Sequence, residues 1–176
     1  MGADRLIAAL AVAALLLAAG CDGGAASQDR PTAATGVVAR VNDGDTLTLG
    51  SGEKIRLVQI DAPELTTDCY GRAAQSALAA LAPVGARVRL VRDPALDDRD
   101  RYGRLLRYVL VGDTDVNVEL VRRGAASPYF FRNERGRYAR ELLAAVERAR
   151  SRRAGFWGAC PGAELNTGLG SITGRA

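Results

Sequence analysis

Hydrophobic and polar residues alternate in several short segments of the chain between Val37 and Val111. A period of two is typical of strands that have one buried face. The segments with this pattern are Val37 to Val41, Thr46 to Leu49, Lys54 to Ile60, Arg87 to Val91 and Arg104 to Val111. Because Pro63 cannot donate a hydrogen bond to a neighbouring strand, the third segment must end before it. The pattern therefore predicts five short strands.

Apolar residues recur at helical spacing in three other segments. These are Tyr70 to Leu81, a short stretch that follows Asp115, and a longer one from about Glu134 to Arg153. Asp115 is a good N-cap for the second helix, and Gly124 is a natural stop for it.

The order of these elements selects a fold class. One helix falls between the third and fourth strands and two follow the fifth, so strands and helices do not alternate as a doubly wound sheet requires. The order fits an α+β protein with a five-stranded OB-type barrel and three packed helices.

The first 20 residues have the pattern of a leader. The apolar stretch "LIAALAVAALLLAA" follows Arg5 and is short for a membrane span, which is typical of a signal peptide. Ala18, Ala19 and Gly20 run directly into Cys21, as in a bacterial lipobox, where the cysteine is lipidated and becomes the mature N-terminus. We expect an exported protein anchored to the cell membrane through Cys21, on its extracytoplasmic side. Ordinary secretion with a coincidental cysteine is the alternative.

Two segments lack any periodicity. Residues 21–35 are small and polar, which predicts a flexible tether. Residues 161–176 are rich in Gly, Thr and Ser, which predicts a disordered tail. The folded domain is then expected over residues 36–160.

Arginine supplies nearly all of the positive charge. The formal net charge is +4, and Lys54 is the only lysine. Arginine suits bidentate contact with phosphate or carboxylate, although a GC-rich genome would produce the same excess. Histidine is absent, which excludes a histidine general base and a zinc site built from histidines.

Cys69 and Cys160 remain as a pair once Cys21 is assigned to lipid. In an exported chain such a pair predicts a disulfide, and two buried free thiols are the alternative.

An Asp-Gly pair separates the first two predicted strands. Asp43 and Gly44 suit a type I′ hairpin turn, which needs positive φ. The turn does not explain Asp45, because aspartate has a low strand propensity and this one opens the second strand.

Further charges stand where a core strand would not carry them. Arg56 lies inside the third strand, Asp61 and Glu64 lie at its end, and Arg104 opens the fifth strand. With Asp45, these carboxylates could surround a hard cation, and the arginines could bind a phosphodiester. Each residue alone also fits a turn, an exposed strand edge or a surface ion pair.

Three motifs in this chain resemble the staphylococcal nuclease (thermonuclease) family. They are "VNDGDTLTL", "IRLVQIDAPE" and "DRYGRLLRYVL", and the resemblance extends from Gly36 to Trp157 through "YGRAAQSALAAL", "VNVELVRRGAA" and "GFWGAC". It implies an OB-fold nuclease that cuts DNA and RNA with little sequence preference. It also implies calcium as cofactor and products with 3′-phosphates.

The resemblance assigns the candidate metal and water sites. Asp45 and Asp61 would bind calcium together with the backbone carbonyl of Ala62. Glu64 would orient or deprotonate the attacking water.

The resemblance also assigns the candidate substrate contacts. Arg56 and Arg104 would clamp the phosphate, Tyr102 would lie near it, and Arg101 stands where the family has a basic residue. A second active-site tyrosine of the family falls on either Tyr129 or Phe130.

Two other functions stay open at this level. An OB barrel can bind single-stranded nucleic acid without cutting it, and an envelope lipoprotein could simply hold calcium. No obligate protein partner is expected, and the chain is expected to be a monomer.

Overall fold

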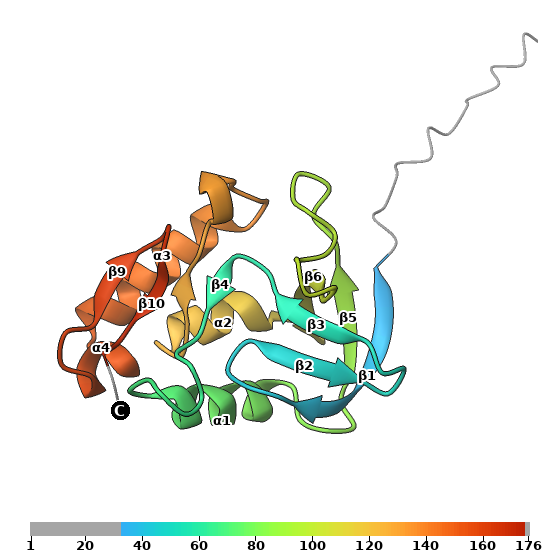
Figure 1. Ribbon diagram of the computed structural model, residues 1–176, viewed down its shortest axis with the longest axis horizontal. Coiled ribbons are helices and arrows are strands. Elements are labelled where there is room, and N and C mark those ends of the chain that lie inside the picture. The colour runs from blue at the N-terminus through green and yellow to red at the C-terminus, as the bar shows by residue number, and fades with distance from the viewer. Residues whose placement is uncertain (1–32, 175–176) are drawn as a thin grey trace, which may run out of the picture. The chain divides into compact units, whose positions relative to one another are not determined.

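Residues 33–174, the part of the chain that this computed structural model describes, contain a closed β-barrel (Figure 1). Its strands are β1 (Ala34–Val41), β2 (Thr46–Leu49), β3 (Lys54–Leu57), β5 (Arg87–Val91) and β6 (Leu105–Val111). The sheet has the order β3-β2-β1-β5-β6 and ends in the short β7 (Thr114–Asp115). A parallel pairing of β3 with β6 closes the barrel. The expected α+β class and five-stranded OB-type barrel are confirmed.

Three helices accompany the barrel, as predicted; the first two contact its strands, and the third packs against the second. They are α1 (Gly71–Leu81), α2 (Val116–Arg122) and α3 (Ala139–Ser151). Asp115 caps α2, because its carboxylate accepts a hydrogen bond from the Val118 amide at 3.0 Å. Apolar side chains of barrel and helices form one core, which includes Leu47, Ile55, Leu57, Leu78, Leu120, Leu142 and Val146. Burial of each such side chain is worth about 1.5 to 3 kcal/mol, so this core joins helices and barrel into one unit.

The last helix begins later than predicted. Residues 134–138, which were assigned to its start, form a loop, and the 3-10 turn η1 (Phe131–Asn133) precedes them. In this loop the amides of Gly136 and Arg137 donate to the side chains of Gln59 and Asp93, at 2.9 and 2.7 Å, and not to carbonyls of a helical turn. A further short helix, α4 (Phe156–Ala159), follows α3.

The turn between β1 and β2 differs from the predicted type I′ hairpin. Positive φ occurs at neither Asp43 nor Gly44. Glycine is required at position 44 for a different reason: a Cβ there would lie 2.6 Å from the Cβ of Ala62 and 2.8 Å from that of Ala74. Close packing, not the turn conformation, therefore excludes a side chain.

The predicted third strand is divided in two by Gln59. This residue has a φ of 62°, and the short strand β4 (Ile60–Asp61) follows it. The buried Gln59 side chain donates to the Glu134 carbonyl and accepts from the Tyr108 hydroxyl. The kink directs the chain out of the barrel to pair with β8 (Ser127–Pro128). It thereby sets the position of Asp61.

The prediction of a disordered C-terminal tail is wrong for the described residues. Strands β9 (Glu164–Asn166) and β10 (Gly170–Ile172) form an antiparallel hairpin, and β10 contacts β4 and β8 (Figure 1). The Phe130 amide donates to the Thr167 carbonyl at 2.7 Å, which ties the hairpin to the domain. A Gly- and Ser-rich composition is typical of disorder, but here small residues permit close packing.

The N-terminal boundary also differs by two residues. Strand β1 begins at Ala34, which pairs with Leu90, so Ala34 and Thr35 belong to the barrel and not to the tether. The predicted leader, Cys21 and the tether up to residue 32 lie outside the described residues. Between residues 33 and 174, no helix is long and apolar enough to span a membrane.

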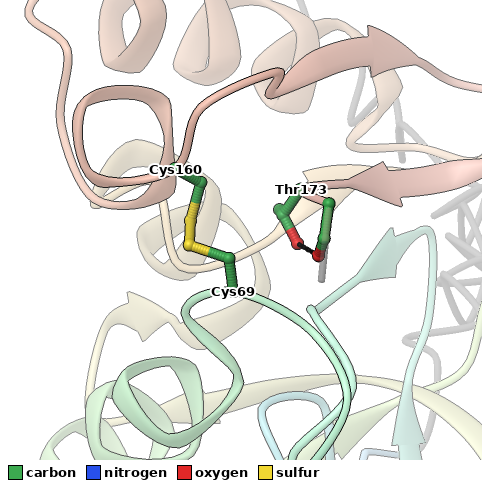
Figure 2. The surroundings of a disulfide bond; sticks show 4 residues. Cys69, Cys160 and Thr173 are labelled. Carbon is green, nitrogen blue, oxygen red and sulfur yellow. Dashed lines mark hydrogen bonds between the residues drawn. A yellow bond between two sulfur atoms is a disulfide. The ribbon is translucent and has the colours of Figure 1, made fainter. Parts of the chain in front are cut away.

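Cys69 and Cys160 are joined in a disulfide (Figure 2). Their Cα atoms are 5.9 Å apart, and the bridge connects the segment before α1 with the end of α4. The C-terminal hairpin therefore starts from a covalently fixed point.

Candidate active site

Asp45 is buried at the start of β2. Its Oδ2 accepts a hydrogen bond from the Ala62 amide at 2.9 Å, and its Oδ1 accepts one from the Thr46 hydroxyl at 3.1 Å. Burial raises the pKa of Asp45 to about 6, and the negative charges of Asp43 and Asp61 add to this, while the charge of Arg56 opposes it. A carboxylate in this position favours additional positive charge beside it.

Arg56 lies between two carboxylates. It stands on β3 opposite Thr46, with Nε 3.0 Å from Asp45 Oδ1 and Nη2 2.9 Å from Asp61 Oδ1. Nη1 donates to the carbonyls of Leu57 and Ile60, both at 2.6 Å. Only 11% of the side chain is exposed, so the guanidinium is held in one orientation.

Asp61 is the more accessible of the two predicted carboxylate ligands, with 31% of its side chain exposed. Its Oδ2 accepts hydrogen bonds from the amide and the hydroxyl of Ser171, at 2.9 and 3.0 Å. Sequence analysis missed Ser171 because it lies in the segment expected to be disordered. One sequence signal could have predicted this hairpin: the glycines of "TGLGS" lie between two short stretches that mix apolar and polar residues, which is typical of a hairpin turn.

Glu64 is exposed in the turn after β4. Partial burial raises its pKa, and the charges of Asp61 and Asp43 raise it further. Within residues 33–174 no protein group hydrogen-bonds its carboxylate, which leaves its oxygens available to water.

Arg104 faces the same site from the start of β6. Its Nε is 2.6 Å from Asp100 Oδ2, and its Nη1 donates to the Thr46 hydroxyl at 3.1 Å. Since that hydroxyl donates to Asp45, Thr46 joins Arg104 to the buried carboxylate. Thr46 and Asp100 are two further site residues that sequence analysis missed; a polar residue beside Asp45 and an aspartate four residues before Arg104 were the available signals.

Tyr102 and Arg101 lie on the exposed loop before β6. Tyr102 is 68% exposed. The guanidinium carbons of Arg101 and Arg104 are 4.7 and 5.5 Å from the centre of its ring. The structure thus places an aromatic ring and two cations on one surface.

The structure separates the two candidates for a second active-site aromatic residue. Phe130 is 1% exposed and belongs to the core. Tyr129 is half-buried, and its ring centre is 6.5 Å from that of the exposed Phe131. Of the two, only Tyr129 can reach a bound molecule.

The predicted metal ligands Asp45 and Asp61 converge on Arg56 from two sides, and Ala62 contacts Asp45. In residues 33–174, no group of three or more acidic, histidine or cysteine side chains is arranged to hold a metal ion. Two carboxylates and a carbonyl are an all-oxygen set, which fits a hard cation that keeps several water ligands.

Comparison with known proteins places this site in a family. Residues 54–159 match the family model described as staphylococcal nuclease homologue. The chain is 37% identical over 103 residues to a thermonuclease of Staphylococcus intermedius, across 54% of the chain and 60% of that protein. It is 34% identical over 126 residues to an uncharacterized endonuclease of Haemophilus influenzae, across 68% of the chain and 64% of that protein. It is 30% identical over 128 residues to a thermonuclease of Staphylococcus hyicus, across 68% of the chain and 73% of that protein.

The match to the first two of these relatives thus spans somewhat less than two thirds of their length. The family model nevertheless covers more than half of the chain, including the elements that carry Arg56, Asp61, Glu64 and Arg104. The chain belongs to the staphylococcal nuclease family.

Proposed function

We propose that this protein is a calcium-dependent nuclease that hydrolyses phosphodiester bonds of DNA and RNA with little sequence preference and leaves 3′-phosphates. The observation that carries the proposal is the network Asp61–Arg56–Asp45–Thr46–Arg104, which joins two carboxylates and two guanidiniums at one edge of the barrel. The names of the relatives, thermonuclease and endonuclease, support it.

Arg56 and Arg104 bind the scissile phosphate. Each guanidinium is already oriented by protein acceptors, Arg56 by two carbonyls and Arg104 by Asp100. The positive charge of each guanidinium gains most as the phosphorus becomes five-coordinate and negative charge builds on the phosphate oxygens. The two arginines therefore stabilise the transition state more than the bound substrate.

Asp45, Asp61 and the Ala62 carbonyl would hold calcium. When bound, the ion supplies positive charge beside a phosphate oxygen and beside water. The raised pKa of Asp45, caused mainly by burial, supports this assignment because a bound cation would offset that cost.

Glu64 holds the attacking water and accepts its proton. Its pKa is above the ordinary value through partial burial and the charges of Asp61 and Asp43, which makes its carboxylate a stronger base.

The proposal includes a lipid anchor on Cys21 of an exported, monomeric protein. The leader, the small residues before Cys21 and the disulfide of the domain support export. Cys21→Ser should move the protein from the membrane fraction to the medium; retention in the membrane fraction would contradict the anchor.

Hydrolysis by the purified full chain tests the proposed activity. Single- and double-stranded DNA and RNA are incubated with calcium, with magnesium alone and with a chelator. We expect cleavage of all of these polymers with calcium and none with the chelator, and the new 5′ ends should be free hydroxyls that a kinase labels directly. Binding without cleavage would identify a non-catalytic OB-fold protein, and cleavage that survives chelation would exclude the metal assignment.

A further inference from the structure

The C-terminal hairpin β9–β10 lies beyond residues 54–159, which match the family model, yet it contacts the candidate active site. Strand β10 lies beside β4 (Figure 1). From this strand, the amide and the hydroxyl of Ser171 both donate to Asp61 Oδ2, at 2.9 and 3.0 Å. One oxygen of a candidate metal ligand is therefore bound by a segment outside the matched region.

The residue before Ser171 permits this contact. Gly170 has a φ of +89°, and a Cβ at this position would overlap the carboxylate of Asp61. Only glycine allows the hairpin backbone to approach the carboxylate this closely.

The hairpin is fixed at both of its ends. Cys160 precedes it and is bonded to Cys69, and the Cys69 amide donates to the Gly174 carbonyl at 3.1 Å. Figure 2 shows Thr173 beside the disulfide, and this residue is buried. Ser171 is thus held in place by the domain and can in turn orient Asp61.

The two hydrogen bonds divide the roles of the Asp61 oxygens. Oδ2 is occupied by Ser171, while Oδ1 faces Arg56 at 2.9 Å, on the side where Asp45 also lies. A partly exposed aspartate without these bonds would sample several rotamers. Binding an ion would then fix one of them, and the loss of conformational entropy would weaken ion binding. Hydrogen bonds to a ligating carboxylate remove this cost.

We infer that Ser171 is a positioning residue for calcium and that the β9–β10 hairpin is part of the active site. Ser171 fixes Asp61 in the rotamer that presents Oδ1 to the ion. The inference rests on the proposed function, because that function makes Asp61 a calcium ligand.

Calcium titrations of the full chain, solubilised in detergent, test this role without any cleavage assay. Binding of calcium alone is followed by the NMR shifts of the Ala62 and Ser171 amides in the wild type, Ser171→Ala and Ser171→Thr. Loss of a group that hydrogen-bonds a metal-ligating carboxylate typically weakens metal binding about 10- to 100-fold. Because Ser171→Ala keeps its amide donor, we expect the lower end of this range, and Ser171→Thr should restore wild-type affinity.

Ser76→Ala is the matched control, because the Ser76 hydroxyl bonds only to the Arg72 carbonyl within α1. It should bind calcium like the wild type. Circular dichroism without calcium shows whether each variant keeps its fold.

Equal affinity in folded Ser171→Ala and wild type would overturn the inference and leave the proposed function intact. Tighter binding by Ser171→Ala would also overturn it, because the hairpin would then compete with the ion for Asp61. If the wild type binds no calcium, the proposed cofactor fails, and this inference fails with it.

Discussion

Arg104 Nη1 donates a hydrogen bond to the hydroxyl of Thr46 at 3.1 Å, across 58 residues of sequence. The same hydroxyl donates to Asp45, so a neutral side chain connects a candidate phosphate-binding arginine directly before β6 to a candidate metal ligand directly before β2. The orientations of the two charged groups are therefore coupled.

Thr46→Val should slow cleavage because it removes this connection while keeping the shape of the side chain. A hydrogen bond to a charged group is worth about 1.5 to 3 kcal/mol, so we expect kcat/KM to fall by roughly tenfold or more. Steady-state cleavage of a labelled oligonucleotide measures the effect. Thr46→Ser keeps the hydroxyl and should retain most of the activity; an equal loss in both variants would show that packing, not the hydrogen bond, matters.

Asp100 should make stability depend on pH. Partial burial would raise its pKa, but hydrogen bonds from Arg104 and Tyr102 outweigh this and hold the pKa below its ordinary value. The carboxylate therefore stabilises the fold above the unfolded-state pKa of about 3.9, and this contribution is lost as the pH falls through the lower folded-state value.

Asp100→Asn should accordingly be less stable than the wild type at neutral pH, and the difference should shrink as the pH falls below the ordinary aspartate range. Urea denaturation at a series of pH values measures it. Asp113→Asn, an exposed change in the turn after β6, is the control and should follow the wild type. A difference for Asp100→Asn that is constant with pH would contradict the role of its charge.

Gly44→Ala should destabilise the domain, since its Cβ would collide with the Cβ atoms of Ala62 and Ala74. Overpacking of this kind costs about 1 to 3 kcal/mol. Gly50→Ala is a matched control, because the nearest atom to its Cβ would be the Val37 carbonyl oxygen at 3.8 Å. Denaturant unfolding of both variants compares them, and equal stability would contradict the packing explanation.

The Cys69–Cys160 bridge should contribute strongly to stability. It closes a loop of 91 residues, for which the chain-entropy model gives about 4 to 5 kcal/mol. The double variant Cys69→Ser/Cys160→Ser should lose stability of this order in urea unfolding. Adding a reductant should destabilise the wild type by the same amount and should not change the stability of the double variant. A double variant as stable as the oxidised wild type would refute the prediction.

The barrel and its helices were predictable because they repeat a local pattern. Alternation placed β2 and β5, and helical spacing placed α1, within a residue of their observed ends. The catalytic candidates could be found because Asp45, Arg56 and Arg104 are charged residues at positions where strands require apolar or neutral ones.

Features that depend on tertiary contacts escaped prediction. The left-handed Gln59 is stabilised by the distant Tyr108 and Glu134, and nothing local signals it. The hairpin that carries Ser171 has few apolar residues, so only the glycines of its turn indicate it, and it is held by hydrogen bonds to Asp61 and Cys69 and by the disulfide. These are the parts of the molecule that shape the site.

The cleavage rate of Glu64→Gln tests the central claim most directly. Glutamine keeps the size of the side chain but cannot accept a proton from water, and loss of a general base typically slows the chemical step about 10²- to 10⁴-fold. Rates are measured in single turnovers with saturating calcium, and the thermal midpoint shows that the fold is intact. We expect a fall within this range with an unchanged midpoint, whereas a folded Glu64→Gln variant that cuts at the wild-type rate would contradict the account.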